Sequence, residues 1–173
     1  SGNTKEISYY LVEFAKKRGL RYIQDECNNV VIFKDASEGY EKAPVVMLQG
    51  HMDMVCEKKP ESSHDFAKDA LRLGIDGDFI YAKDTTLGGD DGIAVAYVLA
   101  ILEDDTLQHP ALEVVITVDE EIGLLGAAAL DTAPLKAKYL LNLDSEEEGY
   151  LWAGCAGGMT AVSKLPVRYQ EYT

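Results

Sequence analysis

Three mostly apolar stretches each end directly in acidic or imidazole side chains, and this pattern constrains the fold more than any other feature. The stretches cover residues 45–49, 112–118 and 139–143. Apolar runs of this length are typical of strands that are buried on both faces of a sheet. Helical patterns separate them, and an alternation of strands and helices predicts an α/β fold with a mixed or parallel sheet.

The other elements can be predicted from periodicity, glycines and turn residues. An amphipathic helix is expected over 4–18, and a strongly apolar helix over 93–102. The remaining elements are strands over 20–24 and 30–33, a hairpin of 71–75 with 79–82, a short helix over 124–130, and later strands over 151–153 and 160–165.

Composition excludes several classes of protein. The 173 residues are 47% hydrophobic, which is enough for one domain with a core, and the net charge of −14 disfavours nucleic acid and anionic lipid as partners. No apolar run reaches the ~18 residues of a membrane helix. The three cysteines form no CxxC pair, and residues 1–6 do not resemble a signal peptide. We therefore expect a cytoplasmic protein without disulfides.

The charged clusters at the strand ends are expected to meet, because sites in open α/β sheets lie beyond the carboxyl ends of the strands. Like charges held close together must take up protons or bind cations. One imidazole with several carboxylates suits zinc, manganese or cobalt better than calcium, and a pair of metals needs a bridging carboxylate. The groups at strand ends are His51, Asp53, Glu120, Glu121 and Asp144, and a fourth cluster, Asp90 with Asp91, opens the apolar helix.

Each of these groups, taken alone, has a more ordinary interpretation. His51 could be a hydrogen-bonded core histidine, and Asp90 could simply cap a helix N-terminus. The pair at 120–121 and the acidic run at 146–148 could be solvated, and Asp144 could begin a turn. What favours a shared metal site is that all four clusters, three at strand ends and one at the start of a helix, fall where the site of an α/β sheet should lie.

Four motifs resemble those of the M20 metallopeptidases. They are Gly-His-Met-Asp-Met-Val at 50–55, Thr-Thr-Leu-Gly-Gly-Asp at 85–90, Asp-Glu-Glu at 119–121 and Asn-Leu-Asp at 142–144. A finer similarity, to the aminoacyl-histidine dipeptidase branch, rests on residues 64–66, 85–94, 144–149 and 154–158. The resemblance implies a zinc-peptidase-like three-layer fold with a mixed, mostly parallel central sheet.

The resemblance also implies metal-ligand roles. His51 and Asp144 would bind the first of two divalent metals, Glu121 the second, and Asp90 would bridge them. Zinc is the expected metal, with cobalt or manganese as alternatives. Asp91 stands where the branch tends to have Asn, so it is not assigned as a ligand.

Two further residues would act in catalysis. Glu120 would be the general base that takes a proton from the attacking water, and Asp53 would fix the tautomer of the metal-binding imidazole. The implied reaction is hydrolysis of dipeptides, of the Xaa-His type. The alternatives are another M20 hydrolase, such as an N-acyl amino acid deacylase or a tripeptidase, and an inactive metal-binding homologue. A glutamate placed to act as a base argues against the last.

Family members are longer, so residues 1–173 are expected to be the N-terminal portion of the catalytic domain. The lid and dimerisation domain, and the C-terminal catalytic portion, would then be absent. A further histidine ligand of the second metal would also be missing, since neither His64 nor His109 fits that role. We expect this chain alone to show little peptidase activity and the full-length protein to be a homodimer.

Overall fold

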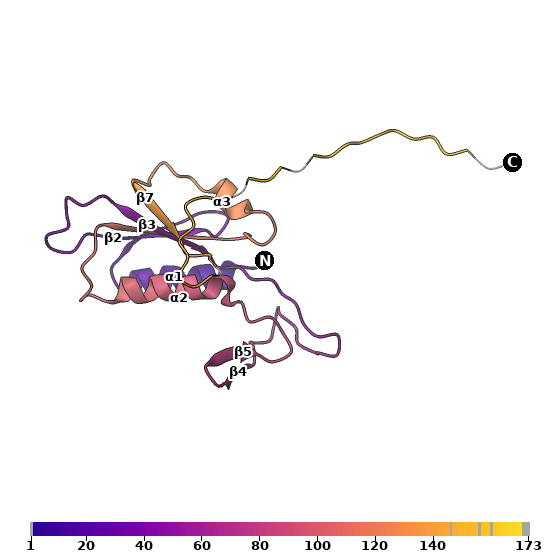
Figure 1. Ribbon diagram of the computed structural model, residues 1–173, viewed down its shortest axis with the longest axis horizontal. Helices are drawn as coiled ribbons and strands as arrows, with labels where there is room; N and C mark the ends of the chain where they lie inside the picture. The colour runs from indigo at the N-terminus through magenta and orange to yellow at the C-terminus, as the bar shows by residue number, and fades with distance from the viewer. Residues whose placement is uncertain (1, 146, 156, 160, 171–173) are drawn as a thin grey trace.

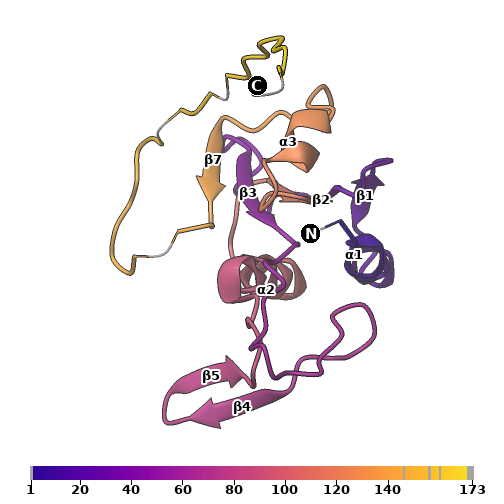
Figure 2. The same cartoon turned by 90° about the vertical axis from the view of Figure 1, so that its right-hand side faces the viewer.

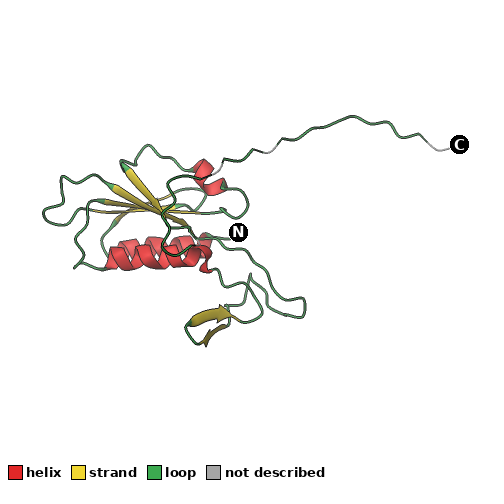
Figure 3. Ribbon diagram, in the orientation of Figure 1, coloured by secondary structure: helices red, strands yellow, loops and turns green. Residues whose placement is uncertain are grey.

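The computed structural model describes residues 2–145, 147–155, 157–159 and 161–170. Glu146, Ala156 and Thr160, which belong to stretches singled out in the sequence, lie outside the described residues. The elements, shown in Figures 1 and 3, are α1 (Lys5–Lys17), β1 (Arg21–Gln24), β2 (Val30–Lys34), β3 (Val46–His51), β4 (Leu73–Asp76), β5 (Phe79–Ala82), α2 (Gly89–Glu103), β6 (Leu112–Thr117), α3 (Leu125–Ala129) and β7 (Tyr139–Asn142).

Five strands form the central sheet in the order β1-β2-β6-β3-β7. The pairs β6–β3 and β3–β7 are parallel, whereas β1–β2 and β2–β6 are antiparallel. Only β2 therefore runs against the others, which confirms a mixed and mostly parallel sheet. Because β3 lies between β6 and β7, the segments that follow these three strands emerge side by side at one edge of the sheet.

Helices cover both faces of this sheet, as expected for three layers. Figure 2 shows α1 and α2 on one face and the short α3 on the other. Side chains of α1 and α2 pack with β2, β3 and β6 in the larger apolar core, and a smaller core lies on the opposite face. The β4–β5 hairpin forms as predicted and projects beyond α2, away from the sheet (Figure 2).

The two predicted late strands are wrong. Residues 151–153, and those of 160–165 that the structure describes, form no strand. Figure 1 shows this part of the chain running away from the sheet. Its apolar side chains are open to solvent, with Leu151 99% exposed. A β-propensity pattern becomes a strand only where a neighbouring strand supplies hydrogen-bond partners and a surface to pack against, and the described part of this segment has neither.

Candidate metal centre

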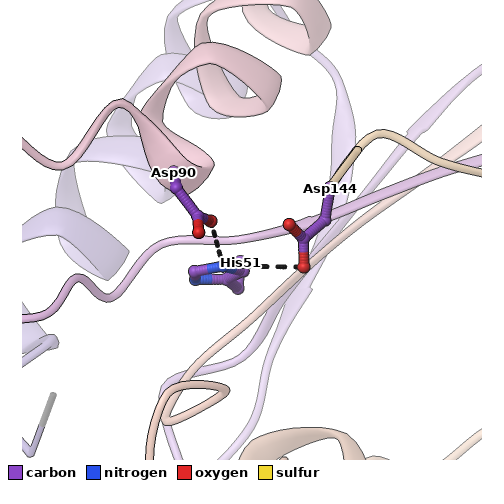
Figure 4. A group of neighbouring side chains, drawn as sticks. All are labelled: His51, Asp90 and Asp144. Atoms are coloured by element: carbon purple, nitrogen blue, oxygen red, sulfur yellow. Dashed lines mark hydrogen bonds and ion pairs between the residues drawn. The ribbon is translucent and has the colours of Figure 1, made fainter. Parts of the chain in front are cut away.

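His51 is the centre of the predicted cluster. It ends β3, and its ring is buried, with 1% of the residue exposed. Its Nε2 atom lies 3.0 Å from Asp90 Oδ1, 3.8 Å from Asp144 Oδ2 and 3.9 Å from Glu120 Oε2. Figure 4 shows the Asp90 and Asp144 carboxylates converging on the imidazole, one from the start of α2 and the other from the segment after β7.

Two groups of side chains are close enough to hold a cation. His51, Asp90 and Asp144 form one group, and His51, Glu120 and Glu121 form the other; the ligand atoms within each group lie within 4.8 Å of one another. The strand ends predicted to meet are therefore brought together. Imidazole and carboxylate donors at such spacing fit a divalent transition metal.

Asp53 holds several parts of this cluster together. Its backbone carbonyl lies 3.0 Å from His51 Nδ1, and its carboxylate oxygen Oδ1 lies 3.4 Å from the same atom. The carboxylate also accepts the backbone N–H groups of Glu120 at 3.1 Å and of Glu121 at 3.3 Å. A proton on Nδ1 would leave the Nε2 lone pair facing the acidic groups, which is the tautomer a metal-binding histidine needs.

The pKa values of His51 and Glu120 are both raised, in part by the negative charges of neighbouring carboxylates. Burial alone lowers the pKa of His51, but the carboxylates of Asp53 and Asp144 and the hydrogen bond that the ring makes to Asp90 raise it by more. Burial raises the pKa of Glu120, and the charge of Asp144 raises it further against the opposing effect of His51. Both pKa values are shifted in the direction that binds a proton, and the part of each shift that comes from the neighbouring carboxylates is a repulsion that a cation between these groups would relieve.

Asp91 and Gly50 are structural parts of the site that sequence reasoning did not assign. Asp91 is 2% exposed, and its Oδ2 accepts the backbone N–H of His51 at 3.2 Å. Burial, the largest influence, raises the pKa of Asp91 to about 6. The peptide bond between Asp90 and Asp91 is cis, and both residues have non-helical backbone angles at the start of α2. Gly50, the glycine directly before His51, was the sequence signal that could have revealed the close packing of Asp91 against the end of β3.

Replacing Gly50 with Ala is expected to destabilise the protein by about 1–3 kcal/mol through overpacking. A Cβ atom there would lie 2.6 Å from Asp91 Oδ2 and 2.8 Å from Ala94 Cβ. Urea denaturation measures the loss. Gly92→Ala is the matched control, because nothing lies within 4 Å of its Cβ position and its helix favours Ala. Equal stability of the two variants would contradict the close packing of β3 against α2.

The other two histidines lie outside the cluster. His64 is buried and packs edge-on against Phe66, with 4.6 Å between ring centroids. His109 Nδ1 lies 2.8 Å from the Pro110 carbonyl. Neither belongs to the metal-binding groups found among the described residues.

The described helices include none that is both long and apolar enough to cross a membrane.

An imidazole and several carboxylates gathered at the ends of parallel strands and at the start of a helix form a candidate metal-binding centre of an open α/β protein. Comparison with known proteins identifies the family. The sequence of residues 47–163 matches the family model of peptidase family M20/M25/M40, and this range includes every residue of the candidate metal centre. The chain belongs to this peptidase family.

Individual relatives agree with this assignment. The chain is 42% identical over 165 residues to the cytosol non-specific dipeptidase of Escherichia coli, covering 95% of this chain and 34% of that protein. Among solved structures, aminoacylhistidine dipeptidase from Vibrio alginolyticus matches with a TM-score of 0.83 and 42% identity over 86% of this chain and 30% of its own. A tripeptidase from Staphylococcus aureus matches with a TM-score of 0.71 and 27% identity over 85% of this chain and 39% of its own.

Proposed function

We propose that this chain forms part of a metal-dependent dipeptidase in which a glutamate acts as general base. The observation that carries the proposal is the convergence of acidic side chains from the start of α2 and from the segments after β6 and β7 on the Nε2 atom of His51. The similarity to a dipeptidase over almost the whole chain supports it. The chain spans about a third of the length of that relative, so the activity is proposed for the full-length protein.

His51, Asp90 and Asp144 would hold one divalent ion, and Glu121 a second, with Asp90 shared between the two. The groups present favour zinc, with cobalt or manganese able to occupy the same donors. When bound, such ions lower the pKa of water and polarise a carbonyl group.

Glu120 would take the proton from the attacking water and return it to the leaving amine. Its partial exposure leaves it accessible to a substrate, and its raised pKa brings it closer to neutrality, where a general base is most effective. Asp53 would orient both partners, because it contacts the ring of His51 and the backbone of Glu120.

The substrate is proposed to be a dipeptide, with Xaa-His as the favoured type. Similarity to aminoacylhistidine dipeptidase supports this choice. A tripeptidase is the second candidate, supported by the similarity to the Staphylococcus aureus enzyme. Deacylation of N-acyl amino acids would use the same metal ligands, whereas an inactive metal-binding homologue would have no use for Glu120.

Residues 1–173 are proposed to be the N-terminal portion of the catalytic domain of a longer homodimeric protein. The short share of each relative that the chain covers supports this domain assignment. A cytoplasmic location is supported by the name of the Escherichia coli relative, which describes a cytosolic enzyme.

Metal reconstitution of the full-length protein tests the proposed function. Chelation should abolish hydrolysis of Xaa-His dipeptides, and zinc, cobalt or manganese should restore it. Tripeptides and N-acyl amino acids, assayed in parallel, distinguish the alternatives. Full activity after the metal has been removed, with residual content checked by mass spectrometry, would refute the proposal.

A further inference from the structure

The loop between β6 and α3, residues 118–124, carries Glu120 and Glu121. Within it, Asp119 and Leu124 have positive φ angles of 53° and 60°. Left-handed backbone is unfavourable for residues other than glycine, and it persists only where surrounding contacts impose it. This loop therefore needs anchors to keep its two glutamates in one geometry.

We propose that Asn29 is a positioning residue for Glu120 and Glu121, because its side-chain amide joins the two ends of their loop. The Val118 N–H donates to Asn29 Oδ1 at 3.0 Å, and Asn29 Nδ2 donates to the Gly126 carbonyl at 2.9 Å. These two hydrogen bonds form the Asn29 clamp. The inference rests on the proposed function, since it assigns those glutamates to the site.

The clamp is rigid because the Asn29 amide is itself fixed. Its Nδ2 also donates to Asp25 Oδ2 at 2.7 Å, and its backbone N–H donates to Asp25 Oδ1 at 2.8 Å. Asn29 is 1% exposed, so water does not compete for these bonds. A buried amide with its donor and acceptor both engaged holds its neighbours in one arrangement.

The fit at the far end of the loop is equally tight. A Cβ atom at Gly126 would lie 2.3 Å from the Val118 carbonyl oxygen and 2.6 Å from Asn29 Oδ1. Only glycine allows the two ends of the loop to approach this closely. Asp53 holds the middle of the same loop through the amides of Glu120 and Glu121, so the clamp and Asp53 together leave the glutamates little freedom.

The clamp can be tested without any assumption about activity. Hydrogen–deuterium exchange of this 173-residue chain, measured without metal, reports the order of residues 119–126. Asn29→Ala should accelerate exchange there about tenfold, the effect of losing one to two hydrogen bonds. Leu112→Ala is the matched control, because it truncates a buried side chain at the opposite end of β6. It should leave local exchange in the loop unchanged.

Zinc affinity separates positioning from a purely structural role. In calorimetric titrations with zinc chloride, Asn29→Ala should bind about tenfold more weakly than wild type, and Leu112→Ala should match wild type. Asn29→Ser, whose single hydroxyl can replace only part of the clamp and adds no charge beside Asp25, should fall between them. It also replaces Asn29→Ala if that variant does not fold.

The possible outcomes are distinct. Unchanged loop exchange in the Asn29 variants would overturn the clamp, and accelerated exchange with wild-type zinc affinity would overturn its positioning role. A wild-type chain that binds no zinc, together with a full-length protein that hydrolyses no peptide, would instead refute the proposed function. In that case the exchange data would still decide whether Asn29 orders the loop.

Discussion

Glu120→Gln in the full-length protein is expected to lower kcat by about 10²–10⁴-fold, the usual contribution of a general base. Gln keeps the size and polarity of Glu120 but cannot accept the proton. Metal content should persist, since His51, Asp90 and Asp144 form a group of ligand atoms that does not need Glu120. Steady-state hydrolysis of an Xaa-His dipeptide, combined with metal analysis of the same sample, measures both quantities.

The exposed carboxylate of Glu38 offers a control of identical chemistry. Glu38→Gln should retain wild-type turnover. A Glu120→Gln enzyme that also lost its metal would assign Glu120 to metal binding, and one with wild-type turnover would remove it from catalysis.

Asp90→Ala is the second change expected to have a large effect, acting on metal binding. The Asp90 carboxylate lies 3.0 Å from His51 Nε2 and is the group proposed to bridge both ions. Residues that only support ligands contribute about 10–100-fold to metal affinity, so loss of a shared ligand should weaken zinc binding by more than about 100-fold. Calorimetry on this chain, and metal analysis of the full-length protein, measure the loss.

Asp78→Ala provides the comparison, because it removes an exposed carboxylate in the β4–β5 turn, on the hairpin that projects away from the sheet. Zinc affinity in Asp78→Ala should be unchanged. If Asp90→Ala retained wild-type zinc affinity, the bridging role would be wrong and the ions, if present, would be held by other groups.

Local sequence was sufficient for most of the fold. Continuous apolar runs predicted β3, β6 and β7, and the Asp-Gly pair at 76–77 predicted the β4–β5 turn. These features are readable because burial and turn geometry act on residues a few positions apart. The prediction of the two late strands was wrong because it used the same local features. Residues 151–165 have a strand-like composition, but strand pairing depends on partners elsewhere in the chain.

The sequence by itself determined which residue types stand at the strand ends and that they should meet there. Only the tertiary structure decided how they meet: that three carboxylates face one nitrogen of His51, and that Asp53 binds the amides of Glu120 and Glu121. The Asn29 clamp joins residues 89 positions apart in the chain. No local pattern encodes such a contact, because it exists only once β2 and β6 have paired and brought the two backbones together.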